Sequence, residues 1–111
     1  MEFLVPSKAP GNFTVTECSS TSITAYWQLP PADSRNGIIA GFKLFYKRKD
    51  SVASPKMIIL NNGKIHVKNV TELDEYTEYE FQVLAFTSVG DGPKSSLELA
   101  KTAEDGECQV F

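Results

Sequence analysis

The sequence has no long apolar run, only two cysteines and one histidine, and no excess of positive charge. A membrane-spanning helix needs about 18 or more apolar residues, so we expect no direct membrane insertion by this segment. The net charge of -3 gives no general attraction to nucleic acid. Cys18 and Cys108 are far apart, without a CxxC motif or clustered histidines, so we expect no metal site.

The arrangement of chemically reactive residues is not that of an enzyme. His66 is predicted in a strand beside Lys68, and no Ser or Cys nucleophile has a base and an orienting acid near it in a recognisable pattern. The carboxylates are scattered over predicted surface turns. We therefore expect no catalytic residue and no cofactor.

The composition is that of one soluble globular domain. Hydrophobic residues make up 41% and charged residues 23% of 111 residues, enough for a single core. We interpret residues 1–5 as a leader from cloning, 6–105 as the domain and 106–111 as a C-terminal tail. The tail is interpreted as an expression scar, an unusual natural C-terminus or a splice ending.

The strongest pattern lies between Leu73 and Phe86. Tyr79, Phe81 and Val83 alternate with polar residues, which predicts a strand over 78–87 with one face in a core. Leu73 sits in the turn before it. A tyrosine so placed can bury its ring while its hydroxyl returns to the preceding loop backbone, an arrangement called a tyrosine corner.

Six further strands are predicted from the same period of two. Residues 12–18 place Phe13 and Val15 on one side, and 23–28 send Trp27 inward. The remaining strands are predicted at 42–47, including Tyr46, at 56–60, at 64–70 and at 97–102 with Leu97 and Leu99 alternating. No convincing helix interrupts them. The pattern indicates an all-β fold, a seven-stranded antiparallel sandwich.

The connection between 56–60 and 64–70 is predicted as a tight hairpin. Asn62-Gly63 is typical of a turn with positive φ, which makes 64–70 the antiparallel partner of 56–60. The alternation over 64–70 does not define one buried face, because Ile65 and Val67 share one face of the strand whereas Val70 lies on the opposite face. A bulge or a shift of sheet near Lys68 is therefore required.

From about residue 6 to 105 the chain resembles the fibronectin type III domain. The matching positions are Pro10, Trp27 before Leu29-Pro30, Gly41 to Tyr46, Leu73, Tyr76 to Phe81, Val83, Ala85, Ser88 to Pro93 and Thr102 to Asp105. The resemblance implies an immunoglobulin-like sandwich with strands A, B and E facing C, C', F and G. It also implies a core signature of Trp27, Tyr46, Leu73, Tyr79, Phe81 and Val83.

The loops look like those of tandem copies in neural adhesion molecules, axon-guidance receptors and receptor-type tyrosine phosphatases. This implies a non-catalytic protein-interaction module in the extracellular part of a single-pass membrane protein, with a cell-surface or matrix protein as partner and neighbouring domains in the parent chain. The alternatives are a passive spacer and a heparan-sulfate-binding module. Candidate contact surfaces are loop 32–41, loop 87–93 and the sheet face with Phe45, Leu84 and Phe86.

Two modification sites and one disulfide are candidates. Asn12-Phe13-Thr14 and Asn69-Val70-Thr71 both match the N-glycosylation pattern. The strand order brings Cys18 to the end of the domain where the last strand finishes, within reach of Cys108. The alternatives are that the two pair or that both thiols are free.

Four cations follow one another closely in and after the strand at 42–47: Lys43, Lys47, Arg48 and Lys49. Cations gathered on one face can bind the sulfates of heparan sulfate. The other interpretation is a solvated outer sheet face, protected at its edge by lysines.

Overall fold

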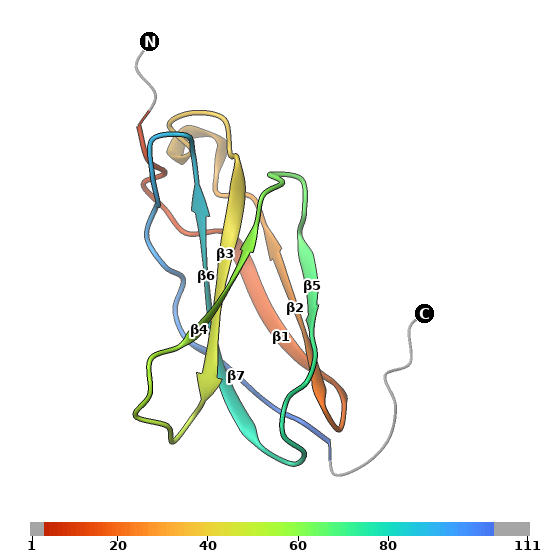
Figure 1. Ribbon diagram of the computed structural model, residues 1–111. Helices are drawn as coiled ribbons and strands as arrows, with labels where there is room; N and C mark the ends of the chain where they lie inside the picture. Colours follow the sequence, from red (N-terminus) through yellow and green to blue (C-terminus); the bar gives the residue numbers. More distant parts are fainter. Residues whose placement is uncertain (1–3, 104–111) are drawn as a thin grey trace.

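The computed structural model describes residues 4–103 and is an antiparallel sandwich of two sheets (Figure 1), which confirms the predicted fold class. The three-stranded sheet has the order β1 (Gly11–Ser19), β2 (Ser22–Gln28) and β5 (Val67–Val70). The four-stranded sheet has the order β4 (Lys56–Leu60), β3 (Gly41–Arg48), β6 (Glu78–Phe86) and β7 (Glu98–Lys101). A 3-10 turn, η1 (Ala32–Ser34), is the helical element of the described residues.

The core lies between the sheets, where strand alternation places it. Ile23, Ala25 and Trp27 of β2 are buried against the inward side chains of β3 and β6. The Trp27 ring lies 5.5 Å from that of Phe42, centroid to centroid, and its indole Nε1 donates a hydrogen bond to the Ile65 carbonyl at 3.1 Å. The one polar atom of this large side chain is thus paired, which removes the cost of burying it.

The remaining signature residues surround this centre. Leu73, Tyr79, Phe81 and Val83 are buried, whereas Tyr46 is half-buried at the side of the sandwich. Its ring stacks on Phe81, with centroids 5.9 Å apart and an interplanar angle of 22°. Tyr46 therefore closes the core laterally instead of lying inside it.

The predicted hairpin at Asn62-Gly63 is wrong. β4 pairs only with β3, and β5 pairs with β2 in the opposite sheet, so residues 61–66 cross from one sheet to the other. Neither Asn62 nor Gly63 has a positive φ. Gly63 is needed for another reason: a Cβ there would overlap the carbonyl of Ile39. The predicted change of sheet is present, but it precedes Lys68.

The alternation of Leu97 and Leu99 does not mark the buried face of β7. In the register of β7 with β6, Ala100 lies opposite the buried Tyr79 and Leu99 lies opposite Glu80. Ala100 packs on the core, whereas Leu97 and Leu99 are 53% and 50% exposed. The apolar side of this short edge strand therefore faces out of the sandwich.

The tyrosine corner is formed at the start of β6. The Tyr79 hydroxyl accepts a hydrogen bond from the Asp74 amide at 2.8 Å. The buried Thr102 hydroxyl supports the same turn, since it accepts from the Thr77 amide at 2.9 Å and donates to the Asp74 carbonyl at 2.7 Å. Thr102, near the end of the described chain, thus fixes the loop that holds Leu73.

The N-terminal segment is bound at the opposite pole, where Figure 1 places it beside the loops that follow β2 and β6. The Leu4 amide donates to the Asn36 carbonyl at 2.8 Å, and its carbonyl accepts from the Thr87 hydroxyl at 3.0 Å. Pro6 is buried. Leu4 and Val5, which the sequence led us to place in a leader, therefore contact both candidate loops; residues 1–3 lie outside the described part.

Candidate functional site: the outer face of the four-stranded sheet

The outward side chains of β4, β3 and β6, together with Leu97 and Leu99, form a surface that we call the four-stranded face. Met57 lies opposite Phe45, and Phe45 lies opposite Gln82. Leu97 lines a shallow hollow together with Phe45 and Gln82. These register partners give a continuous row of side chains from one edge of the sheet to the other.

Exposed apolar side chains are concentrated on the two edges of this face. Met57 and Ile59 of β4 are each 47% exposed, comparable to Leu97 and Leu99 on the other edge. These large apolar side chains are half exposed to water. A partner that covers them removes their apolar area from solvent, which favours binding. They are the clearest candidates for a contact surface among the described residues.

The middle of the face is less open than the sequence led us to expect. Leu84 is buried, so its assignment to an exposed surface is wrong. Its register partner Lys43 reaches across β6 to Asp91, with Nζ to Oδ2 at 2.9 Å and Nζ 5.7 Å from the centre of the Phe86 ring. The lysine stem therefore lies over β6 between Leu84 and Phe86.

Phe45 has a similar cover. The ammonium of Lys94 lies 4.2 Å from the centroid of the Phe45 ring, a cation–π geometry. Phe45 is half-buried as a result. Phe45 points away from the core, so core packing does not account for an aromatic residue there. Its ring instead supports Lys94, from the segment between β6 and β7.

Each of the four cations considered for heparan sulfate is paired with a carboxylate. The N–O distances are 2.9 Å for Lys43–Asp91, 3.4 Å for Lys47–Glu80, 2.7 Å for Arg48–Asp74 and 3.6 Å for Lys49–Glu78. Exposed pairs of this kind contribute little to stability, about 0–1 kcal/mol each. They do neutralise the local field, so the four residues form no uncompensated cationic patch.

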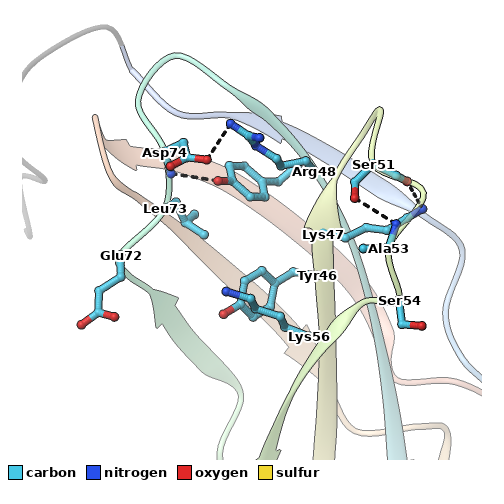
Figure 2. A pocket seen from close by; sticks show the side chains of 11 residues that line it. Tyr46, Lys47, Arg48, Ser51, Ala53, Ser54, Lys56, Glu72, Leu73 and Asp74 are labelled. Atoms are coloured by element: carbon cyan, nitrogen blue, oxygen red, sulfur yellow. Dashed lines mark hydrogen bonds and ion pairs between the residues drawn. The ribbon is translucent and has the colours of Figure 1, made fainter.

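A pocket of about 220 Å³ lies between the β3–β4 turn and the loop before β6 (Figure 2). Lys47 donates to the Ser51 carbonyl at 3.0 Å, and the Arg48 guanidinium lies 2.7 Å from the carboxylate of Asp74, whose backbone amide is bonded to the Tyr79 hydroxyl. The Arg48–Asp74 ion pair drawn in Figure 2 thus ties the end of β3 to the loop before β6. The pocket contains no histidine or cysteine, and it offers no nucleophile paired with a base.

No metal centre is present among residues 4–103, since no group of three His, Cys, Asp or Glu side chains comes together there. His66, the one histidine, is exposed, with Nδ1 3.4 Å from the Lys64 carbonyl. Within the same residues, no helix is both long and apolar enough to cross a membrane.

The remaining candidates lie away from this face. Asn12 and Asn69 are exposed on strands of the three-stranded sheet. Cys18 of β1 is disulfide-bonded, next to Ser19, whose carbonyl accepts from the Ala103 amide at 3.1 Å. The end of the described chain therefore reaches the end of β1, as predicted; Cys108 lies outside the described residues.

The two loops considered as contact surfaces occupy the pole of the N-terminal segment. Ile38 and Val89 project from them and are exposed. The carbonyls of Asn36 and Ser34 accept hydrogen bonds from the Leu4 and Ser7 amides, both at 2.8 Å. The Asn36 side chain donates to the Val5 carbonyl, and the Thr87 hydroxyl donates to the Leu4 carbonyl, both at 3.0 Å. The loops therefore hold the entering chain, which leaves less of their surface for a separate partner.

A seven-stranded sandwich with a tyrosine corner and a buried tryptophan defines an immunoglobulin-like module. Comparison with family models matches residues 8–101 to the fibronectin type III domain. The chain belongs to this family.

The chain is also similar to two individual proteins in sequence and to one solved domain in structure. Protein sidekick-2 of Mus musculus is 37% identical over 102 residues, and receptor-type tyrosine-protein phosphatase F of Bos taurus is 37% identical over 101 residues. These matches cover 91% and 90% of the chain, but only 5% of each relative's length. The solution structure of the third fibronectin III domain of human KIAA0343 protein superposes with a TM-score of 0.82 at 23% identity, over 96% of this chain and 90% of that one, which shows the shared fold.

Proposed function

We propose that the chain is a non-catalytic protein-recognition module from the extracellular part of a single-pass cell-surface adhesion molecule or receptor. The observation that carries this proposal is the set of half-exposed apolar side chains on the edges of the four-stranded face, at Met57, Ile59, Leu97 and Leu99. The relationship to a receptor-type phosphatase supports a place at the cell surface. The partner is a cell-surface or matrix protein, and the parent chain contributes neighbouring domains.

The chemistry of the face defines the kind of partner surface that fits it. The apolar residues lie on a rigid sheet, so little conformational entropy is lost when they are covered. Lys94, whose ammonium lies over the Phe45 ring, makes no ion pair with another described residue. A complementary partner presents apolar side chains opposite the two edges of the face and a carboxylate near Lys94.

The passive spacer remains the second candidate, and it is favoured by the hydrogen bonds between the entering chain and the loops at 34–36 and 87. A domain whose entry is fixed in this way sets the direction of whatever precedes it. The spacer requires no partner on the four-stranded face. The heparan-sulfate candidate is disfavoured by the four ion pairs.

The test is a binding screen of the chain, displayed in multiple copies to raise avidity, against an array of purified cell-surface and matrix ectodomains. We expect at least one partner whose signal is lost in the variant Leu97→Asp with Leu99→Asp. The matched control, Thr16→Asp with Gln28→Asp, adds the same charge to exposed strand positions of the other sheet and retains binding. Equal binding by both variants, or no partner at all, supports the spacer and contradicts recognition through this face.

A further inference from the structure

The outer face of the three-stranded sheet differs in chemistry from the four-stranded face. The register of β1, β2 and β5 places only uncharged side chains on it, and all but Tyr26 and Val67 are polar. They are Asn12, Thr14, Thr16, Thr24, Tyr26, Gln28, Val67 and Asn69. We call these residues the three-stranded face. A surface without charge offers no electrostatic selectivity to a protein partner.

Both N-glycosylation motifs lie on this face and on its two edge strands. β1 and β5 flank the central β2, so Asn12 occupies one edge and Asn69 the other. Asn12 meets Gln28 at one end of β2, with Nδ2 to Oε1 at 2.6 Å, and Asn69 lies opposite Thr24 near the other end. The two asparagines are thus separated along β2 by four residues, about 13 Å at the rise of a strand.

Each motif is accessible as the modification requires. Asn12, Thr14, Asn69 and Thr71 are all exposed. The Asn69 amide oxygen accepts a hydrogen bond from the Thr24 hydroxyl at 3.2 Å, which orients the amide and leaves its nitrogen, the atom that carries a glycan, outside that bond. The Asn12 nitrogen contacts only another exposed side chain, Gln28.

The apolar residues of this face lie between the two motifs. Tyr26 is 46% exposed and lies opposite Val67, which is 40% exposed. Tyr26 is also the diagonal neighbour of Asn69, at about 7–8 Å for such pairs. The first sugars on Asn69 therefore reach the tyrosine ring, and the carbon–hydrogen face of a sugar removes apolar area of the ring from water.

We infer that Asn12 and Asn69 both carry N-linked glycans, which cover the three-stranded face and block both of its edge strands. Unpaired edge strands are templates for association with other chains, and a bulky glycan on each edge prevents this. The four-stranded face is then the open surface of the domain. The inference rests on the proposed extracellular function, because the modification takes place in the secretory pathway.

Site occupancy is tested by secreting the chain from mammalian cells and measuring its mass before and after treatment with peptide-N-glycosidase. We expect two glycans in the parent chain, one in Asn12→Gln and in Thr14→Ala, and one in Asn69→Gln and in Thr71→Ala. Asn61→Gln, at an exposed asparagine outside either motif, retains both. A folded, secreted chain with either motif unoccupied overturns the inference.

Coverage of the face is tested with a tyrosine-modifying reagent and peptide mapping. We expect Tyr26 to react several-fold faster after enzymatic removal of the glycans. Tyr76, exposed and set against Arg48 and Lys101 of the four-stranded sheet, reacts equally in both forms and serves as the internal control. Equal reactivity of Tyr26 in both forms contradicts coverage. Neither failure affects the proposed recognition, because the screen with Leu97→Asp and Leu99→Asp is readable with unglycosylated protein.

Discussion

The Tyr79 hydroxyl lies 2.8 Å from the Asp74 amide nitrogen, and this bond ties the start of β6 to the loop that precedes it. The loop also carries Leu73, which is part of the core. One hydrogen bond therefore links a strand of the four-stranded sheet to the segment that arrives from β5 in the other sheet. The bond connects the two layers at this pole of the domain.

Removing the Tyr79 hydroxyl measures this connection. We expect Tyr79→Phe to lower the free energy of unfolding by about 1–2 kcal/mol, because the ring still fills its site but the partly buried Asp74 amide loses its acceptor. This corresponds to a drop in Tm of about 4–8 °C per kcal/mol for a domain of this size. Tyr26→Phe, at an exposed ring, is the control and leaves Tm unchanged. An unchanged Tm in Tyr79→Phe would show that the bond contributes nothing.

Thr102 supports the same loop from the other end of the chain. In Thr102→Val the Thr77 amide loses its acceptor and the Asp74 carbonyl loses a donor, so we expect a loss of about 1–3 kcal/mol in denaturant unfolding. Thr102→Ser keeps the hydroxyl and is expected to retain most of the stability. If Thr102→Val and Thr102→Ser unfold at the same denaturant concentration, the hydroxyl is not the stabilising group.

Gly63 provides a test of the crossing between the sheets. An added Cβ would overlap the Ile39 carbonyl, part of the backbone, so we expect Gly63→Ala to cost about 1–3 kcal/mol. Gly11→Ala is the matched control, because its Cβ meets only the Leu29 carbonyl at 3.8 Å, an ordinary contact. The free energies of unfolding of the two variants are compared by chemical denaturation. Equal stability of Gly63→Ala and Gly11→Ala would contradict the close approach of Gly63 to the Ile39 carbonyl.

The ion pairs predict a particular behaviour on a heparin column. We expect the parent chain to elute at low salt, and Asp74→Asn with Glu80→Gln to elute later, because the change frees Arg48 and Lys47 from their carboxylates. Glu17→Gln with Asp33→Asn alters the net charge equally but releases neither cation, and should elute with the parent. Strong retention of the parent chain that is lost when Lys47 and Arg48 become alanine would instead establish a heparan-sulfate site.

The strands and the central core follow from local alternation. Phe81, Val83 and Trp27 stand in runs where every second residue is apolar, and a strand with one buried face has no other way to place them. The family resemblance adds the division of strands between the sheets. These features depend on residues close together in the sequence, which explains why they could be predicted.

The errors concern features that depend on distant residues. Nothing next to Gly63 indicates that its space is limited by Ile39, and nothing next to Leu97 indicates that Ala100 is the residue facing Tyr79. The apolar edges of the four-stranded face are visible only after β4 and β7 have been assigned their partners. The ion pair between Lys43 and Asp91 likewise joins residues whose proximity results from the register of β3, β6 and the following loop.

Hydrogen exchange with a partner from the ectodomain screen tests recognition through the four-stranded face most directly. On binding, we expect slower amide exchange in β4 and in residues 97–101, and unchanged exchange in β1 and β5. Slower exchange confined to β1 and β5, or to loops 32–41 and 87–93, would contradict it.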